Sequence, residues 1–265
     1  MKHCICALTR GYDNLIEYDT LIKRNNYIYE NIYNKNSEIY DVILFHEGNI
    51  TENHQQYIRS KSPMLPIIFI NVSIEFSKNL KKSIGKYAKT LPNNNSFPFG
   101  YKCMCRFWSY GFIKYTLNYK YVIRIDEDCF LYNFENNIYN YMENNNIYFY
   151  TAKVLHDFDE SNSYSYGLKE LTEEFKIDNN NNNNINYTSV PYTNFCIIDV
   201  NYFNNCVLFN KFCDCIEDEG GIFISRWGDA NIWGIYLYLD NIILNNFLVD
   251  NKIKYYHGTH NALIN

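Results

Sequence analysis

The sequence predicts an α/β fold with a mostly parallel central sheet flanked by helices. Short apolar runs rich in Ile, Val and Phe alternate with segments whose apolar residues recur at helical spacing. Most of these runs are unbroken rather than alternating, as is typical of strands that are buried on both faces of a sheet. One run ends abruptly in the three carboxylates Asp126, Glu127 and Asp128. In an open α/β sheet, ligands bind at the carboxyl ends of such strands.

The individual elements follow from the periodicity and the turn residues. The strands that we expect cover residues 4–9, 41–45, 66–72, 121–125 and 147–151, and regular structure resumes over 192–200. The helices that we expect cover residues 15–28, a segment from Thr51 as its cap to Arg59, 101–115 and 229–239. The run of asparagines over 179–184 cannot bury apolar surface, so we expect a mobile surface insertion near 178–186.

Size and composition indicate one globular domain over residues 1–265. Hydrophobic residues make up 47% and charged residues 20% of the chain, so a sizeable core can form. The formal net charge of −5 argues against nucleic acid as a partner. The chain shows no segment typical of a secretory leader or a bilayer span, so we expect a cytoplasmic protein without a transmembrane segment.

The nine cysteines point to buried thiols rather than to a disulfide framework. Their number is odd, and three pairs are separated by a single residue, a spacing that neither bridges easily nor matches the usual zinc motifs. A reducing compartment agrees with this pattern.

The acidic tripeptide is the strongest candidate for a functional site. Residues at i and i+2 of an extended segment point the same way, so Asp126 and Asp128 can face one hard cation together. The alternative is a solvated acidic turn without a ligand.

Three segments resemble the fungal α-mannosyltransferases of glycosyltransferase family 15. GYKCMCRFWS at 100–109 is similar to the family's Tyr-Arg-x-Met-Cys-Arg-Phe-x-Ser block, and RIDEDC at 124–129 stands where the family has Arg-Val-Glu-Pro-Asp/Asn-Val. GGIFISRWGDA at 220–230 resembles Gly-Gly-Phe-x-x-Glu-Arg-Trp-Gly-Asp-Ala. Thr193-Asn194-Phe195 and Tyr255-Tyr256-His257 match weaker blocks, so the resemblance spans about residues 100–257.

This resemblance implies a GT-A-type fold and a metal-dependent, retaining glycosyltransferase. The donor would be GDP-mannose, a GDP-sugar bound with Mn²⁺ or, as a second choice, Mg²⁺, and the acceptor a carbohydrate or glycoconjugate. We expect residues 1–130 to form the nucleotide-binding half and 131–265 the half that binds sugar and acceptor. The alternatives are a glycosyltransferase with another nucleotide-sugar donor and a catalytically silent protein that binds a sugar or nucleotide.

The metal and nucleotide ligands are predicted as follows. Asp126 is the first choice as metal ligand, Asp128 is a second ligand or an outer partner, and the resemblance adds His257. Thr9 and Arg10 lie at the carboxyl end of the first strand, where the base and ribose of a nucleotide would lie. For His257, the alternative is a solvated tail histidine.

Two arginines and three further residues complete the predicted site. Arg106 and Arg124 can clamp phosphate, the alternative being ordinary salt bridges, which we favour for Arg124 inside its strand. Tyr101 can reach the reacting sugar, while Trp227 and Asp229 can shape the sugar site. The alternative for Asp229 is a cap on the helix that follows it.

Two departures from the family bear on mechanism. Cys196 replaces the Glu that follows Ser-Asn-Phe, a candidate nucleophile, and Ser225 replaces the Glu before Arg-Trp-Gly-Asp. Retention then agrees better with front-face attack by the acceptor than with two displacements through a carboxylate.

Overall fold

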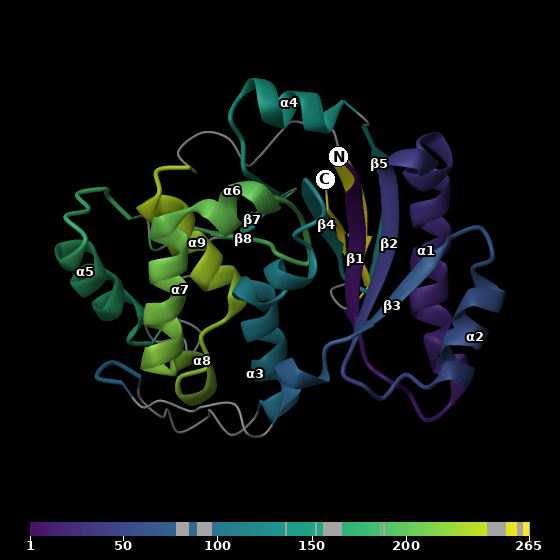
Figure 1. Ribbon diagram of the computed structural model, residues 1–265, viewed down its shortest axis with the longest axis horizontal. Helices are drawn as coiled ribbons and strands as arrows, with labels where there is room; N and C mark the ends of the chain where they lie inside the picture. Colours follow the sequence, from purple (N-terminus) through teal and green to yellow (C-terminus); the bar gives the residue numbers. More distant parts are fainter. Residues whose placement is uncertain are drawn as a thin grey trace.

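The computed structural model describes residues 1–77, 85–88, 97–135, 137–151, 153–155, 166–185, 187, 189–242, 253–258 and 262–264. A six-stranded sheet forms its centre, in the order β3-β2-β1-β4-β9-β6 (Figure 1). Its strands are β1 (His3–Thr9), β2 (Tyr40–His46), β3 (Ile67–Asn71), β4 (Tyr121–Ile125), β6 (Phe149–Thr151) and β9 (Phe195–Asp199). β1 to β4 run parallel, and β9 lies antiparallel to both β4 and β6. The mostly parallel sheet expected from the sequence is confirmed.

Helices cover both faces of this sheet (Figure 1). One face carries α1 (Asp19–Asn31) and α2 (Glu52–Lys61); the other carries α3 (Phe99–Arg106), α6 (Val200–Asn205), α7 (Val207–Glu219), α8 (Gly221–Ile224) and α9 (Asp229–Leu239). α4 (Ile138–Asn144) and α5 (Leu168–Asp178) lie further out, and short turns of helix are η1 (Leu15–Tyr18), η2 (Tyr33–Lys35), η3 (Ser37–Ile39) and η4 (Ser73–Phe76). Among the described residues, no helix combines the length and apolarity needed to cross a bilayer.

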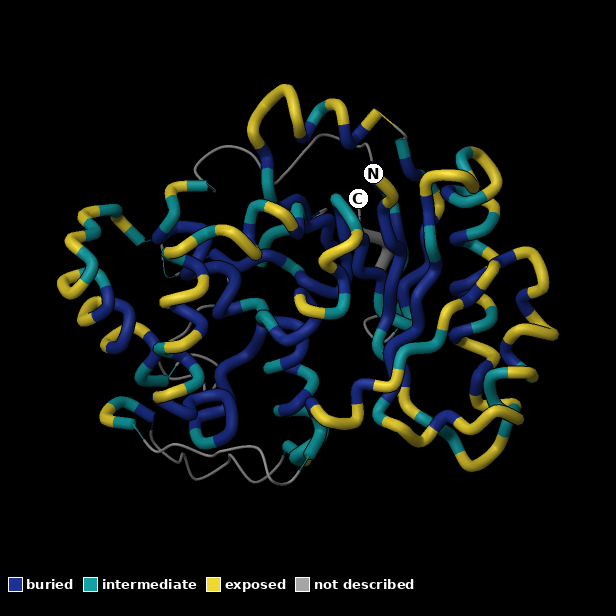
Figure 2. Tube along the Cα trace, viewed as in Figure 1, coloured by how far each residue is buried: buried dark blue, intermediate teal, exposed yellow. Residues whose placement is uncertain are grey.

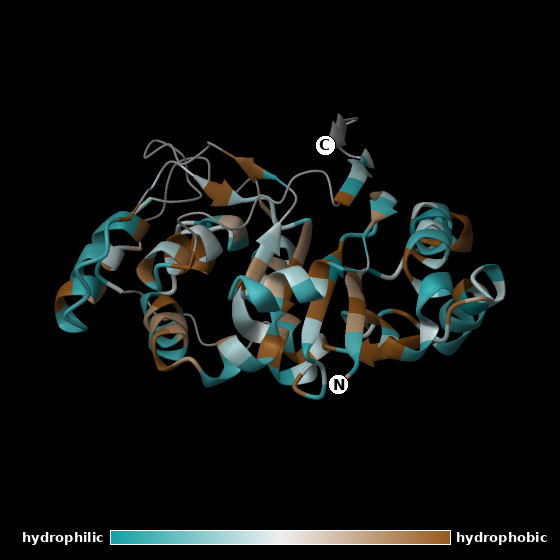
Figure 3. Ribbon diagram, turned by 90° about the horizontal axis from the view of Figure 1, so that it is seen from above, coloured by the Kyte–Doolittle hydropathy of each residue, from teal (hydrophilic) through white to brown (hydrophobic). Residues whose placement is uncertain are grey.

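The strands read as unbroken apolar runs because each face of the sheet has its own core. Along β1, Cys4 and Cys6 pack into the core under α3 and α9, while Ile5 and Ala7 pack into the core under α1 and α2. Figure 2 shows the buried strands between these layers, and Figure 3 shows hydrophilic residues gathered on the outer helices. All nine cysteines are free thiols.

The structure contains two smaller sheets that we did not predict from the sequence. β5 (Cys129–Phe134) pairs antiparallel with β10 (Ile253–His257), which in turn pairs with β11 (Ala262–Ile264). β7 (Val154–Leu155) pairs with β8 (Val190–Pro191). In the ladder of β5 and β10, His257 lies opposite Cys129. The C-terminal segment is thereby brought next to the acidic tripeptide.

The predicted helices agree with the structure in position but not always in form. The region 101–115 contains α3, then a π-helical turn, η6 (Phe107–Gly111), and a short turn, η7 (Ile113–Tyr115). The wider turn leaves the Trp108 carbonyl to accept a hydrogen bond from Trp233 Nε1 at 2.9 Å. α2 begins directly after Thr51, but the Thr51 side chain makes no capping hydrogen bond.

The asparagine run has a structural role that the sequence did not suggest. Asn181 and Asn183 each donate from Nδ2 to the carbonyl of Leu239, at 2.8 Å in both cases. Leu239 is the last residue of α9, whose terminal carbonyls lack partners within the helix. Asn181 and Asn183 therefore cap the end of α9, whereas Asn182 and Asn184 are exposed.

We predict that the double substitution Asn181→Ala and Asn183→Ala destabilises the chain by about 1–3 kcal/mol, since two hydrogen bonds to one helix end are lost. The melting temperature should fall by roughly 2–4 °C per kcal/mol. The matched control is Asn182→Ala with Asn184→Ala, two exposed neighbours in the same run. Equal melting temperatures for the two double variants would contradict the capping role.

Candidate active site

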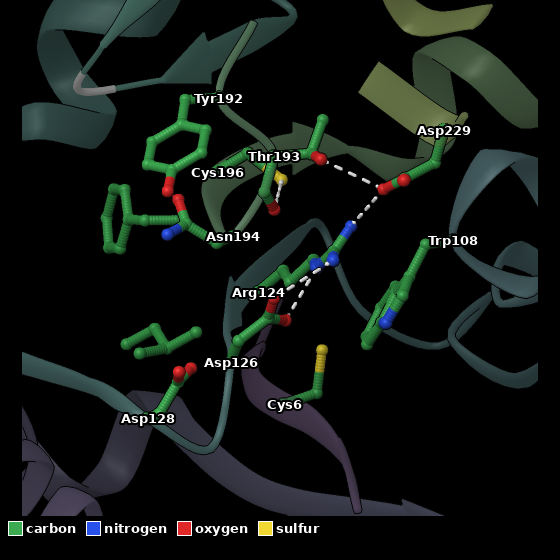
Figure 4. Close-up of polar contacts among 12 residues, drawn as sticks. Cys6, Trp108, Arg124, Asp126, Asp128, Tyr192, Thr193, Asn194, Cys196 and Asp229 are labelled. Carbon is green, nitrogen blue, oxygen red and sulfur yellow. Dashed lines mark hydrogen bonds and ion pairs between the residues drawn. The ribbon is translucent and has the colours of Figure 1, made fainter. Parts of the chain in front are cut away.

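Arg124 is the central charged group at the carboxyl edge of the sheet. Alternation along β4 directs its side chain to the face that carries α3 and α9. Its Nε and Nη2 donate to the two oxygens of Asp126, at 2.9 and 3.1 Å, and its Nη1 donates to Asp229 Oδ2 at 2.6 Å (Figure 4). The guanidinium also lies over the ring of Trp108, 4.5 Å from its centroid. One buried cation thus joins the end of β4 to the start of α9, and the ion-pair alternative for Arg124 is confirmed.

Asp229 receives a second hydrogen bond from the chain segment before β9. Thr193 Oγ1 donates to Asp229 Oδ2 at 2.9 Å (Figure 4), and the backbone N–H of Asp126 donates to the carbonyl of Asn194 at 3.0 Å. The Thr193-Asn194-Phe195 block therefore holds both carboxylates that pair with Arg124. Asp229 is the first residue of α9, where the helix dipole also favours a negative charge.

Glu127 points away from this ion pair and toward the end of β1. Its two oxygens accept hydrogen bonds from Thr9 Oγ1 and from the Tyr12 hydroxyl, both at 2.7 Å. Arg10 is exposed, and its guanidinium lies 5.0 Å from the centroid of the Tyr12 ring. Glu127, the middle residue of the acidic tripeptide, thus contacts Thr9 directly and Arg10 through the ring of Tyr12. These are the two residues predicted to bind the nucleotide.

Asp128 faces the C-terminal strand. Its Oδ2 lies 3.3 Å from His257 Nε2, and the backbone N–H of Gly258 donates to its carbonyl at 2.8 Å. A Cβ at Gly258 would lie 3.2 Å from that carbonyl oxygen, so a residue without a side chain suits this close approach. Asp128, Cys129 and His257 place one ligand atom each within 4.8 Å of one another. Asp126 is not part of that group.

A cavity of about 370 Å³ opens beside the three carboxylates. It is lined by Leu8, Tyr12, Thr20, Met104, Trp108, Asp126, Glu127 and Asp128. The volume falls in the range of small-molecule sites, and its lining combines apolar side chains with convergent polar groups. A larger hollow of about 520 Å³ lies on α5, and none of the predicted site residues lines it.

Tyr101 joins the site through α3. Burial raises the pKa of its hydroxyl, and the nearby Cys105 and Asp229 add to the effect. Burial likewise raises the pKa of the Cys105 thiol to about 12, with Asp229 contributing. Both groups are therefore neutral at ordinary pH, and neither adds a charge near the Asp229 carboxylate.

The structure does not bring Arg106 and Trp227 to the cavity lining. Arg106 donates from Nε to both oxygens of Glu217, at 3.0 and 2.8 Å, and from Nη1 to Glu75 at 2.7 Å. Trp227 is fully buried, and its Nε1 donates to the carbonyl of Tyr166 at 2.7 Å. Its ring occupies the space that a side chain at Gly221 would need, since a Cβ there would lie 2.3 Å from the indole.

The charges of the site influence one another. Burial raises the pKa of Asp126; Arg124 opposes this shift, while Asp229 and Asp128 add to it. Burial also raises the pKa of the Cys196 thiol, which lies opposite Arg124 in the β4–β9 ladder. Cys196 is thus a neutral core thiol, and its Sγ points to the Thr193 carbonyl at 3.7 Å (Figure 4).

Sequence reasoning missed several of the residues that build this site. Thr193 belongs to a block that resembles the family, but nothing in the sequence suggested a role for its side chain. Glu127 was noted as part of the acidic tripeptide, but no function was predicted for it. Trp108 and Tyr192 gave no signal, because their contacts join segments far apart in the chain.

We predict that Arg124→Met destabilises the chain by about 3–5 kcal/mol, because it leaves two half-buried or buried carboxylates without their cation. Burial already raises the pKa of Asp126, and without Arg124 this pKa rises further in the folded state. The deficit should therefore be largest at neutral pH and shrink as the pH falls through the raised pKa of Asp126. Chemical denaturation from pH 7 to pH 4 measures this trend. The control is Arg59→Met, whose exposed pair with Glu52 at 3.8 Å should change stability by less than about 1 kcal/mol at either pH.

No protein-family model matches the chain. Among curated proteins, it is 29% identical over 173 residues to the O-glycoside alpha-1,2-mannosyltransferase omh1 of Schizosaccharomyces pombe, a match to 59% of this chain and 43% of that protein. It is 26% identical over 161 residues to the probable mannosyltransferase KTR4 of Saccharomyces cerevisiae, covering 52% of this chain and 34% of that protein. The matches span less than half the length of each of these relatives.

Solved structures with the same fold cover nearly the whole chain. Core-mannan synthase A from Aspergillus fumigatus, in its Mn/GDP form, superposes with a TM-score of 0.77 at 20% identity over 97% of this chain and 74% of that one. The mannosyltransferase Ktr4p from Saccharomyces cerevisiae gives a TM-score of 0.73 at 21% identity over 97% and 70%. These likenesses confirm the GT-A-type fold. The resemblance found in the sequence is confirmed as well, because the curated proteins that the chain is similar to are fungal mannosyltransferases.

Proposed function

We propose that the chain is a metal-dependent, retaining glycosyltransferase that moves mannose from GDP-mannose to a carbohydrate or glycoconjugate acceptor. The observation that carries the proposal is the meeting of Asp128 and His257 beside a cavity at the carboxyl edge of the sheet. Relatives of known class support it, since the matched curated proteins are mannosyltransferases and one structural neighbour holds manganese with GDP.

The donor set fits a manganese ion. Asp128 Oδ2 and His257 Nε2 lie 3.3 Å apart, close to the spacing of about 3 Å between adjacent ligands of an octahedral ion with bonds of ~2.1 Å. Carboxylate and imidazole ligands suit Mn²⁺, with Mg²⁺ as the second choice. Asp126 adds its charge nearby and keeps lone pairs beyond those used by Arg124. When bound, the ion would neutralise charge on the departing diphosphate.

The other residues of the site bind and orient the substrates. Thr9, Arg10 and Tyr12 stand where the nucleoside would lie, on the side of the cavity that Glu127 ties to β1. Asp229 and Tyr101 can form hydrogen bonds to sugar hydroxyls, with Asp229 held in place by Arg124 and Thr193. Trp227, packed against Gly221, would shape the sugar site by fixing the turn before α9 rather than by stacking on the sugar.

The transfer step needs no protein nucleophile. In a front-face reaction, the acceptor oxygen bonds to the anomeric carbon while the bond from that carbon to the diphosphate breaks. The acceptor proton passes to a phosphate oxygen of the leaving group, and configuration is retained. Cys196, with its raised pKa and its place in the core, offers no thiolate for an alternative route.

The buried thiol at position 196 also favours one second candidate, a catalytically silent protein that binds a nucleotide sugar. The two functions share the cavity and the metal ligands, and they differ only in turnover. Incubation with GDP-mannose, Mn²⁺ and a panel of mannosides distinguishes them: released GDP with a mannosylated product supports the enzyme, and saturable binding without product supports the silent protein.

We predict that Asp126→Ala abolishes manganese-dependent GDP binding, while Asp128→Asn and His257→Gln each weaken it by about 10-fold or more. Isothermal titration with and without Mn²⁺ measures the effect. Asp214→Asn, an exposed carboxylate on α7, serves as the matched control and should bind as the unaltered chain does. GDP affinity that is unchanged in Asp126→Ala with Mn²⁺ present would refute the role of this residue.

We further predict that Cys196→Ala keeps transfer with retained configuration, because the thiol is neutral and takes no part in the reaction. Product analysis by NMR gives the anomeric configuration, and intact-mass measurement after incubation with donor alone tests for a glycosyl adduct. An adduct on Cys196, or loss of turnover with GDP binding intact, would overturn the front-face mechanism.

A further inference from the structure

His257 is held at both ring nitrogens. Its Nε2 lies 3.3 Å from Asp128 Oδ2, and its Nδ1 lies 2.6 Å from the hydroxyl of Tyr192. The imidazole is largely buried, and the two rings meet edge to face with centroids 5.6 Å apart. The ring therefore has a defined orientation, with one nitrogen toward the carboxylate and the other toward the phenol.

This arrangement matches what a metal-binding imidazole requires. A nitrogen that ligates a cation must carry a lone pair, so the single hydrogen of the neutral ring must sit on the other nitrogen. Metal-binding histidines usually donate that hydrogen to an oxygen, which fixes the tautomer and the direction of the ligating lone pair. The Tyr192 oxygen is placed to accept it from Nδ1, and this leaves Nε2 for a cation shared with Asp128.

Tyr192 is itself fixed by its backbone. Its N–H donates to the carbonyl of Lys153 at 2.9 Å, and its carbonyl accepts a hydrogen bond from Thr151 Oγ1 at 2.9 Å. Two residues further on, Asn194 Oδ1 accepts from the hydroxyl of Tyr255 at 2.8 Å. Tyr255 and His257 are alternate residues of β10, so both are buried from the same side of that strand.

We propose that Tyr192 is a positioning residue for the metal site: its hydroxyl fixes the tautomer and orientation of His257 and thereby strengthens cation binding by Asp128 and His257. The inference rests on the proposed function, because it takes the divalent cation from there. Tyr192 need not touch the cation or the sugar; it acts through the imidazole alone. The hydroxyl group, not the ring, is what the proposal requires.

The test is Tyr192→Phe in the full chain, which removes only the hydroxyl. Mn²⁺ is titrated with GDP present, and free Mn²⁺ is followed by electron paramagnetic resonance against a protein-free control. We expect Mn²⁺ affinity to fall by about 10- to 100-fold. The control Tyr40→Phe removes another hydroxyl, which pairs with Tyr139 at 2.8 Å in the core. It should leave Mn²⁺ affinity unchanged.

A double-mutant cycle separates positioning from a purely structural role. In a His257→Gln background, adding Tyr192→Phe should cause no further loss of Mn²⁺ affinity, because the hydroxyl then has no imidazole to orient. The absorption spectrum of bound Co²⁺, which reports ligand geometry, should change in Tyr192→Phe and not in Tyr40→Phe. Thermal melting of each variant without metal records any loss of folding.

The outcomes distinguish this inference from the function on which it rests. Full Mn²⁺ affinity in Tyr192→Phe, together with a loss in His257→Gln, overturns the role of Tyr192 and leaves the metal site standing. Equal losses from Tyr192→Phe with and without His257 also overturn it. A chain that binds no Mn²⁺ in the presence of GDP overturns both the inference and the metal-dependent function.

Discussion

The buried pairing of Arg124 with two carboxylates is the constraint on which the rest of the site depends. The guanidinium is 5% exposed and spans Asp126 at the end of β4 and Asp229 at the start of α9. Such a charge is costly to bury unless its partners are held in place. Each partner is also fixed by the backbone or by Thr193, so the ion pair, the segment before β9 and the first turn of α9 form one unit. A shift of any of these parts would leave a buried charge unmatched.

A second arginine acts on the same strand end from the opposite face of the sheet. Arg24 of α1 is fully buried and donates from Nε and Nη2 to the carbonyl of Ile125, at 3.1 and 2.8 Å, and from Nη2 to that of Cys6 at 3.1 Å. Within the described residues no carboxylate contacts it, so backbone and amide oxygens solvate its charge. Burial lowers its pKa to about 10, which still leaves it cationic at neutral pH. Two cations thus flank the strand end that carries three carboxylates, and they offset the repulsion among them.

What the sequence could predict was local, and what it missed includes both long-range contacts and the helices α4 to α8, for which we had no expectation. The bounds of α9 and the positions of β1 to β4 follow from unbroken apolar runs and from the glycines and charges that flank them. The sheet of β5, β10 and β11 was missed because β5 and β10 lie more than a hundred residues apart in the chain. Arg106 shows the same limit: its position in a family motif suggested phosphate, but its partners Glu75 and Glu217 lie on distant segments that only the fold brings together.

The replacement at position 196 can be understood from the β-ladder register. Cys196 lies directly opposite Arg124, so a carboxylate there would sit on the same side of the sheet as the guanidinium. Here the guanidinium already pairs with Asp126 and Asp229, and the neutral thiol of Cys196 adds no further negative charge beside it. In the proposed function, Asp229, at the first turn of α9, would orient sugar hydroxyls, and the anomeric carbon would react only with the acceptor and the departing phosphate.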